Sequence, residues 1–203
     1  MKDYPSIARS NKAPIGEHCI AFYKYDGSNL RWEWSKKKGW NKFGTRNHLF
    51  DKNDLQFGQA IPLFLETIAP KLDDIIKQEF KNIDIVTVFT EYFGPSSFAG
   101  QHLPDEKKEL RLFDVCPHKK CMMNPKDFIN IFGSLPFAAQ VVYEGILAEQ
   151  FIDDIRNNKY PVNEGVVCKG GDRHNLWMVK IKTNIYKQKL IDTYGNRWNN
   201  YWE

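Results

Sequence analysis

The stretch that decides the fold is KYDGSNLR, residues 24–31. It joins an apolar run, residues 19–23, to a second run, residues 30–34, in which apolar and charged side chains alternate. Both runs are typical of β-strands. The Asp-Gly pair between them is typical of a tight hairpin turn, which would leave Lys24 solvated. A lysine held at the end of a strand is also a candidate covalent nucleophile, so both interpretations are open.

Length and composition indicate one globular domain over residues 1–203, ending in a short helix and tail. The net charge of +4 and the aromatic content of 14% are compatible with a nucleic-acid partner, because cations bind phosphates and aromatic rings stack on bases. No apolar run approaches the roughly 20 residues of a membrane span, and the first residues lack a signal sequence. We therefore expect an intracellular monomer that does not enter a membrane, whether cellular or virus-encoded.

Four cysteines are present, and without a secretory signal we expect reduced thiols. Cys116, His118 and Cys121 lie close together in the sequence and raise the possibility of a zinc site. A closed zinc site needs four ligands, and no second pair accompanies these three. The sequence therefore disfavours zinc.

The periodicity of the chain predicts alternating blocks of strands and helices. Apolar residues at helical spacing predict a helical region over residues 54–80, interrupted at Pro70. Residues 1–16 read as a polar arm, and three early strands are expected to form an antiparallel meander. The predicted strands are 19–25, 29–35, 40–45, 83–93, 110–115, 137–143, 165–169 and 177–182, and the further helices are 124–132, 147–157 and 185–194. This order favours an α+β fold with mainly antiparallel pairing.

Charged side chains stand at the ends or edges of five predicted strands. They are Lys24, Arg46, Glu91, Glu164 and the pair Lys180 and Lys182. The two lysines of the pair are two residues apart, so their side chains should point to the same face of the strand. A solvated sheet face would explain such a pair equally well.

Together, these stretches resemble the signature of the covalent nucleotidyltransferases, which include ATP-dependent DNA ligases, RNA ligases and messenger-RNA capping enzymes. The order is Lys-x-Asp-Gly from Lys24, Glu91 before Phe-Gly, Glu-Gly-Val-Val from Glu164, and Lys-x-Lys at Lys180. Four motifs in order are far more specific than any one of them. Ser28-Asn29 looks most like the RNA ligases of the phage T4 RNA ligase 2 type. The resemblance covers almost the whole chain.

The resemblance implies a minimal nucleotidyltransferase domain of two antiparallel β-sheets flanked by helices. It implies that Lys24 attacks the α-phosphate of ATP, forms lysyl-AMP, and passes AMP to a 5′-phosphate that is then joined to a 3′-hydroxyl. RNA is the expected partner, with Mg²⁺ or Mn²⁺ as cofactor. Only the neutral amine can attack, and nearby cations lower the pKa of a lysine, so Lys180, Lys182, Arg46 and the metal would favour the reactive form.

By the same resemblance, each motif residue has an expected role. Lys180 and Lys182 would contact the α-phosphate, Glu164 would serve the metal or the nucleophile, and Asn29 would act in the later steps. The expected nucleotide-binding residues are Tyr23, Lys24, Asn29, Arg46, Glu91, which would bind the ribose, Phe113, which would stack on adenine, Glu164, Lys180 and Lys182, and the expected metal ligands are Glu164 and Glu91. Phe113 could alternatively be a core residue.

The chain departs from the family pattern after Lys182, where 21 residues remain, too few for an OB-fold. This disfavours a capping enzyme and leaves a minimal DNA ligase, or a module that adenylylates without joining strands, as alternatives to an RNA ligase. Two stretches could help to hold a strand by charge and stacking. They are Lys36–Lys38 with Trp32, Trp34 and Trp40, and the tail residues Arg197, Trp198, Tyr201 and Trp202. Each could equally be a solvated turn or a packed tail.

Overall fold

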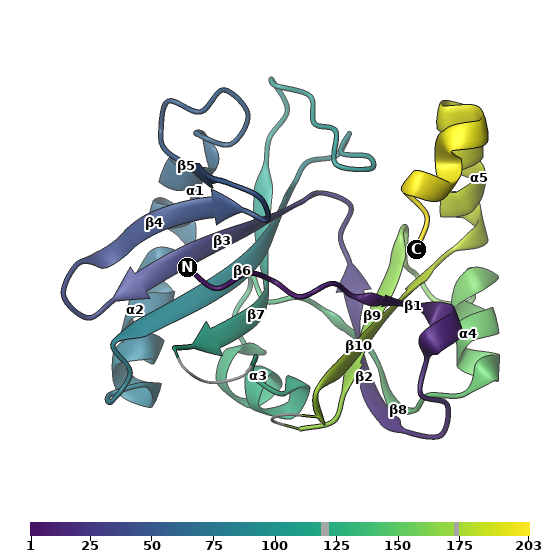
Figure 1. The fold of residues 1–203 in the computed structure, drawn as a ribbon, viewed down its shortest axis with the longest axis horizontal. Helices are drawn as coiled ribbons and strands as arrows, with labels where there is room; N and C mark the ends of the chain where they lie inside the picture. Colours follow the sequence, from purple (N-terminus) through teal and green to yellow (C-terminus); the bar gives the residue numbers. More distant parts are fainter. Residues whose placement is uncertain (119–121, 173–174) are drawn as a thin grey trace. The chain divides into compact units, whose positions relative to one another are not determined.

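Two five-stranded sheets, one in each of two compact units, form the fold (Figure 1). The computed structural model describes residues 1–118, 122–172 and 175–203. The first unit comprises Met1–Tyr4, Asp26–Met123 and Asp127–Ala138, and the second comprises Pro5–Tyr25, Asn124–Lys126 and Ala139–Glu203. The prediction of an α+β fold with two mainly antiparallel sheets and flanking helices is confirmed, and the described residues form no closed barrel.

The sheet of the first unit has the strand order β5-β4-β3-β6-β7, and every neighbouring pair in it is antiparallel. Its strands are β3 (Ser28–Ser35), β4 (Gly39–Thr45), β5 (Leu49–Phe50), β6 (Ile85–Phe93) and β7 (Glu109–Pro117), and its helices are α1 (Ala60–Thr67), α2 (Ala69–Glu79) and most of α3 (Pro125–Phe132). Pro70 lies in the first turn of α2, so the predicted interruption of the helical region at this residue is confirmed.

Trp32 lies at the centre of the core of the first unit. Its ring is fully buried and stacks on Phe64 of α1, with the ring centroids 4.1 Å apart. The indole N–H donates to the Thr90 Oγ1 at 2.8 Å, so the polar end of the side chain is satisfied without water. Trp34 is also buried. The suggestion that these two tryptophans stack on nucleic-acid bases is therefore wrong, because they pack between the sheet and its helices.

The other face of β3 is charged but almost equally buried. Arg31 and Glu33 alternate with the core residues, and the first residues of the chain cover them. The Met1 amino group lies 3.2 Å from the Glu33 carboxylate, which also pairs with Lys42 at 2.7 Å. Asp3 pairs with the Arg31 guanidinium. Part of the predicted polar arm is thus a cover for the charged face of this sheet.

The sheet of the second unit has the strand order β1-β10-β9-β2-β8. Its strands are β1 (Ala8–Arg9), β2 (His18–Lys24), β8 (Val141–Ile146), β9 (Gly165–Gly170) and β10 (Trp177–Lys182), and its helices are α4 (Glu149–Arg156) and α5 (Asn184–Tyr194), with 3-10 turns at Ser10–Lys12 and Gly195–Asn200. β1 runs parallel to β10, and the other pairs are antiparallel. Inward-facing residues of β2, β9 and β10 pack on Phe151 and Ile155 of α4.

The expected meander of the first three strands is wrong. β2 pairs with β8 and β9 in one sheet, whereas β3 pairs with β4 and β6 in the other. Asp26-Gly27 therefore connects two sheets and is not a hairpin turn. A Cβ on Gly27 would lie 2.3 Å from the Tyr92 carbonyl oxygen, so glycine is required there by the close approach of β6.

Three smaller differences concern short or irregular segments. The strand expected at 137–143 is observed as β8, four residues later. The N-terminal arm contributes β1, and the tail forms the 3-10 turn Gly195–Asn200 and ends at Glu203, which is buried. These segments are held by contacts distant in sequence, which local periodicity does not encode.

Replacing Trp32 by alanine should lower the free energy of unfolding by about 3–5 kcal/mol, because a fully buried ring and its hydrogen bond are lost. Trp40→Ala is the matched control in the same sheet, and it should cost less because Trp40 is partly exposed. Denaturant unfolding followed by circular dichroism measures both. Equal losses in the two variants would contradict the placement of Trp32 at the centre of this core.

Candidate active site

One buried carboxylate holds two of the predicted site lysines. The Lys24 Nζ donates to Glu164 Oε2 at 2.9 Å, and the Lys182 Nζ lies 2.8 Å from Glu164 Oε1. The Glu164 and Lys182 side chains are 3% and 7% exposed, and that of Lys24 is 21% exposed. Lys24 is therefore the member of this cluster that is most open to a ligand.

The ends of three neighbouring strands bring these residues together. Lys24 ends β2 and Lys182 ends β10, and both are register partners of Gly165, the first residue of the central strand β9. Glu164 immediately precedes that glycine. A Cβ on Gly165, whose φ is +150°, would lie 2.0 Å from the Ile181 carbonyl oxygen. The Glu-Gly pair of the motif thus combines a carboxylate with a backbone that only glycine can adopt beside β10.

Lys180 lies on the same strand as Lys182, two residues earlier, as predicted. Burial lowers the pKa of the Lys180 ammonium, and the charges of Lys182 and Lys24 lower it further. The carboxylates of Glu164 and Glu203 raise the pKa of Lys180 and so partly offset this effect. Three ammonium groups therefore repel one another around Glu164, and a solvated sheet face does not describe this cluster.

The C-terminal residues also bind Lys182, which the sequence did not reveal. The Lys182 Nζ donates to the Tyr201 carbonyl oxygen at 2.7 Å, and its backbone N–H donates to Glu203 Oε1 at 3.1 Å. Glu203 accepts further hydrogen bonds from the backbone N–H and the hydroxyl of Ser10. The tail thus fixes the end of β10, and Tyr201 and Glu203 are packing residues there.

Tyr23 precedes the nucleophile candidate on β2 and is half-buried. Its ring lies 4.8 Å from that of Tyr25, and its hydroxyl accepts a hydrogen bond from the Asn163 N–H at 3.3 Å. This bond ties Tyr23 to the residue before Glu164. The second unit therefore contains five of the nine predicted site residues, namely Tyr23, Lys24, Glu164, Lys180 and Lys182.

The other four predicted residues, Asn29, Arg46, Glu91 and Phe113, belong to the first unit. Asn29 and Glu91 are register partners on β3 and β6. Arg46 is exposed in the turn after β4. Phe113 is half-buried on β7, so it is not a fully buried core residue.

Tyr4 lies among these residues of the first unit and was not found from the sequence. Its ring meets Phe113 edge-on at 5.2 Å, and its hydroxyl donates to Asp114 Oδ2 at 2.6 Å. Burial and the neighbouring Asp114 raise the pKa of the Tyr4 phenol well above its usual range; Glu91 raises it further, whereas Arg46 lowers it. Tyr4 thus packs on Phe113, and the charges of Glu91 and Arg46 act on its hydroxyl.

A polar loop, residues 94–108, is fixed to the connection that follows the nucleophile candidate. The Ala99 N–H donates to Asp26 Oδ1 at 2.8 Å, and the His102 ring bridges the hydroxyls of Ser28 and Ser97, at 2.9 Å each. Burial lowers the pKa of His102, and Lys108 adds to this effect. A neutral imidazole suits this bridge, because one nitrogen donates and the other accepts. His102 therefore positions the residue next to Asn29.

Within the described residues, no group of three or more His, Cys, Asp or Glu side chains could hold a metal ion by itself. Cys116 is buried, and Cys121 lies outside the described residues. The described residues therefore give no support to a zinc site at Cys116, His118 and Cys121. In the same part of the chain, no helix is both long and apolar enough to cross a membrane.

The chain was compared with family models, with curated proteins and with solved structures. Neither the family models nor the curated proteins gave a match. An RNA ligase from Naegleria gruberi, a variant with AMP and Mn, superposes with a TM-score of 0.64 at 19% identity, over 93% of this chain. A putative ATP-dependent DNA ligase from Aquifex aeolicus superposes with a TM-score of 0.67 at 15% identity, over 98% of this chain. An archaeal ATP-dependent RNA ligase superposes with a TM-score of 0.67 at 14% identity, also over 98% of this chain.

The chain has the fold of these ligases. It spans a little more than half of their length, 58%, 57% and 53% respectively. Both RNA and DNA ligases are among the similar structures, so the likeness to the phage T4 RNA ligase 2 type in particular remains a prediction from Ser28-Asn29.

The pKa of Lys180 should report directly on the charges around Glu164. Lys182→Met removes a repelling cation, so the pKa of Lys180 should rise, whereas Glu164→Gln removes an attracting anion, so it should fall further. Titration of the Lys180 side-chain carbon resonance by NMR measures both shifts. Lys71→Met, on the exposed side of α2, is the control and should leave Lys180 unchanged. Shifts of the same sign in the two cluster variants would contradict this arrangement.

Proposed function

We propose that this protein is an ATP-dependent polynucleotide ligase that works through lysyl-AMP on Lys24 and acts on RNA. The observation that carries the proposal is the cluster of Lys24, Lys180 and Lys182 around Glu164. It supplies a partly exposed amine and two further cations for a phosphate group. The fold shared with ligase structures supports the same conclusion.

In the first step, the Lys24 ammonium loses a proton and its nitrogen attacks the α-phosphorus of ATP. The bond from that phosphorus to the β-phosphate bridging oxygen breaks, pyrophosphate leaves, and a lysyl-AMP phosphoramidate remains. A 5′-phosphate oxygen of a strand then attacks the same phosphorus and releases Lys24. Finally a 3′-hydroxyl attacks the activated 5′-phosphate, a phosphodiester forms, and AMP leaves. Each step builds negative charge on phosphate oxygens, so placed cations are the main catalytic device.

The geometry of the cluster suits the first of these steps. Glu164 holds Lys24 in place before the nucleotide binds, and the triphosphate offers Lys180 and Lys182 a new anion. Before it attacks, Lys24 must lose a proton, because only the neutral amine is a nucleophile. Glu164, once relieved of part of its pairing, can accept that proton or bind a cation.

The residues present fit a divalent cation held jointly with substrate. Mg²⁺ commonly takes only one or two carboxylates and completes its shell with phosphate oxygens and water. Glu164, and by resemblance Glu91, would provide the carboxylates. When bound, Mg²⁺ or Mn²⁺ would neutralise charge on the phosphates. Two of the similar Naegleria gruberi ligase structures are described as containing Mn with AMP or ATP, which supports this assignment.

The remaining assignments rest on the resemblance. Phe113 would stack on adenine, Glu91 would bind the ribose, and Tyr23 and Arg46 would contact the nucleotide, while Asn29 would act once the strand is activated. Tyr4 contacts Phe113 edge-on, and an edge contact leaves the aromatic faces for stacking. We propose likewise that residues 1–203 act as a single catalytic domain, because the assigned residues are divided between the two units.

Incubation with α-labelled ATP and Mg²⁺ or Mn²⁺ should attach label to the wild-type protein and not to Lys24→Arg or Lys24→Ala. Arginine keeps a cation beside Glu164 but stays protonated, so it tests the nucleophile without removing the ion pair. Lys71→Arg is the matched control and should label normally. Label that persists on Lys24→Arg would overturn the assignment, and absence of label on the wild-type protein would overturn the proposed function.

Addition of 5′-phosphorylated strands to the labelled protein should yield joined product, and faster with RNA than with DNA. Nicked duplexes and single strands of both kinds, resolved on a denaturing gel, measure this preference. A preference for DNA would favour the minimal DNA ligase. Label without any joined product would favour the module that adenylylates without joining.

A further inference from the structure

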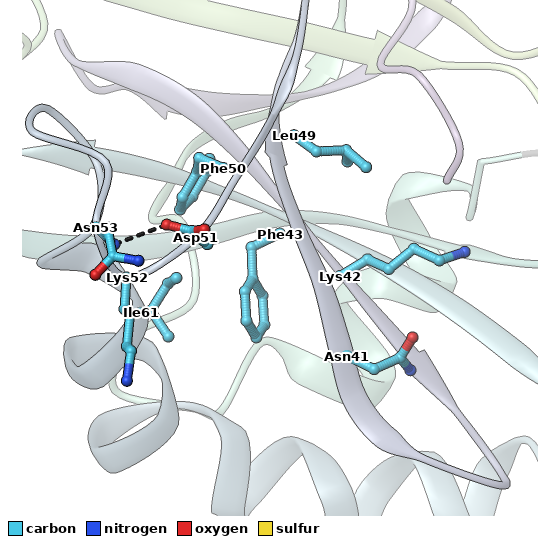
Figure 2. Close-up of a pocket in the computed structure, with 9 residues that line it drawn as sticks. All are labelled: Asn41, Lys42, Phe43, Leu49, Phe50, Asp51, Lys52, Asn53 and Ile61. Carbon is cyan, nitrogen blue, oxygen red and sulfur yellow. Dashed lines mark hydrogen bonds between the residues drawn. The ribbon is translucent and has the colours of Figure 1, made fainter.

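A groove runs beside β4 and β5 in the first unit, and none of the residues assigned to the reaction lines it (Figure 2). Its volume is about 470 Å³. Figure 2 shows the side chains of Phe43, Phe50 and Ile61 between the loop that carries Lys52 and the strand β4. The polar part of the lining consists of Asn41, Lys42, Asp51, Lys52 and Asn53. The groove thus combines an apolar floor with a polar rim.

The groove exists because β5 is too short to cover its neighbour. β5 contains only Leu49 and Phe50, and they pair with Gly44 and Phe43. Within the described residues, the first part of β4 has no strand on its outer side. Leu49, which lines the groove, is 58% exposed. This edge of the sheet therefore offers apolar surface to a partner.

The segment that contains β4 and β5 is strongly basic. Residues 36–53 contain six lysines and arginines and one aspartate, a net charge of +5, while the whole chain carries +4. All other residues together therefore carry −1. Lys42 is paired with Glu33, but Lys36–Lys38 and Lys52 are exposed to solvent.

The spread of these charges indicates an extended polyanion. Lys36–Lys38 precede β4 and Arg46 follows it, and a seven-residue strand is about 23 Å long. A single nucleotide cannot reach both ends, whereas a strand of several nucleotides can. Cations along a groove with apolar and aromatic residues in its floor are what unpaired nucleic acid requires, because phosphates need charge and exposed bases need apolar surface.

We propose that this groove binds an unpaired segment of the nucleic-acid strand, with a base against the exposed side chain of Leu49 and phosphates on the surrounding lysines. The inference rests on the proposed function and deepens it, since it identifies where the first unit holds the strand that is joined.

The test is binding of fluorescently labelled, 5′-phosphorylated single-stranded RNA and DNA, followed by anisotropy at several salt concentrations without ATP. Lys52→Ala should weaken binding and lower the slope of log affinity against log salt by about one. Leu49→Asp places a carboxylate on the groove and should weaken binding about tenfold or more. Lys71→Ala and Ile185→Asp, at exposed positions elsewhere, are the matched controls and should bind as the wild-type protein does.

Both groove substitutions are at exposed positions, and thermal melting of each variant checks that it is folded. Wild-type affinity and salt slope in Lys52→Ala and Leu49→Asp would overturn the inference. So would preferential binding of a polyglutamate peptide, which would identify the groove as a protein-docking surface. Label transfer from ATP is measured separately on the wild-type protein, so failure of the ligase proposal and failure of the groove proposal give different results.

Discussion

The buried carboxylate of Glu164 is the group on which the rest of the candidate site depends. Burying an anion is costly unless cations pair with it, and here Lys24 and Lys182 each take one of its oxygens. The ends of β2, β9 and β10 must therefore stay in register for the charges to balance. Lys24 is held by electrostatics at a strand end that remains partly open, which is the situation a nucleophile requires.

Local sequence patterns predicted most of the strands and helices, because periodicity and proline positions act over a few residues. They failed where a strand pairs with another strand that is distant in the sequence. Asp26-Gly27 has the composition of a hairpin turn, but β2 pairs with strands more than a hundred residues later. The glycine is explained by the approach of the Tyr92 carbonyl oxygen. Turn composition alone could not distinguish a hairpin from a connection between sheets.

The charged residues at strand ends were the informative signal for the site. Four of them, Lys24, Glu164, Lys180 and Lys182, gather in one unit because register partners place them at the same edge. The residues that sequence reasoning missed, Tyr4, His102 and Glu203, lie outside the strands, in the arm, a loop and the tail. Each of them makes at least one hydrogen bond to a residue distant in sequence, for which neither spacing nor composition gives a signal.

The concentration of charge beside β4 also affects how the molecule meets other molecules. Eighteen residues, 36–53, carry a net charge of +5, whereas the rest of the chain carries −1. A polyanion would attract this basic segment before contact, so the protein would approach in a preferred orientation. Association would then be faster at low ionic strength. The edge of one sheet would then set the orientation of approach, whereas the lysines that pair with Glu164 belong to the other sheet.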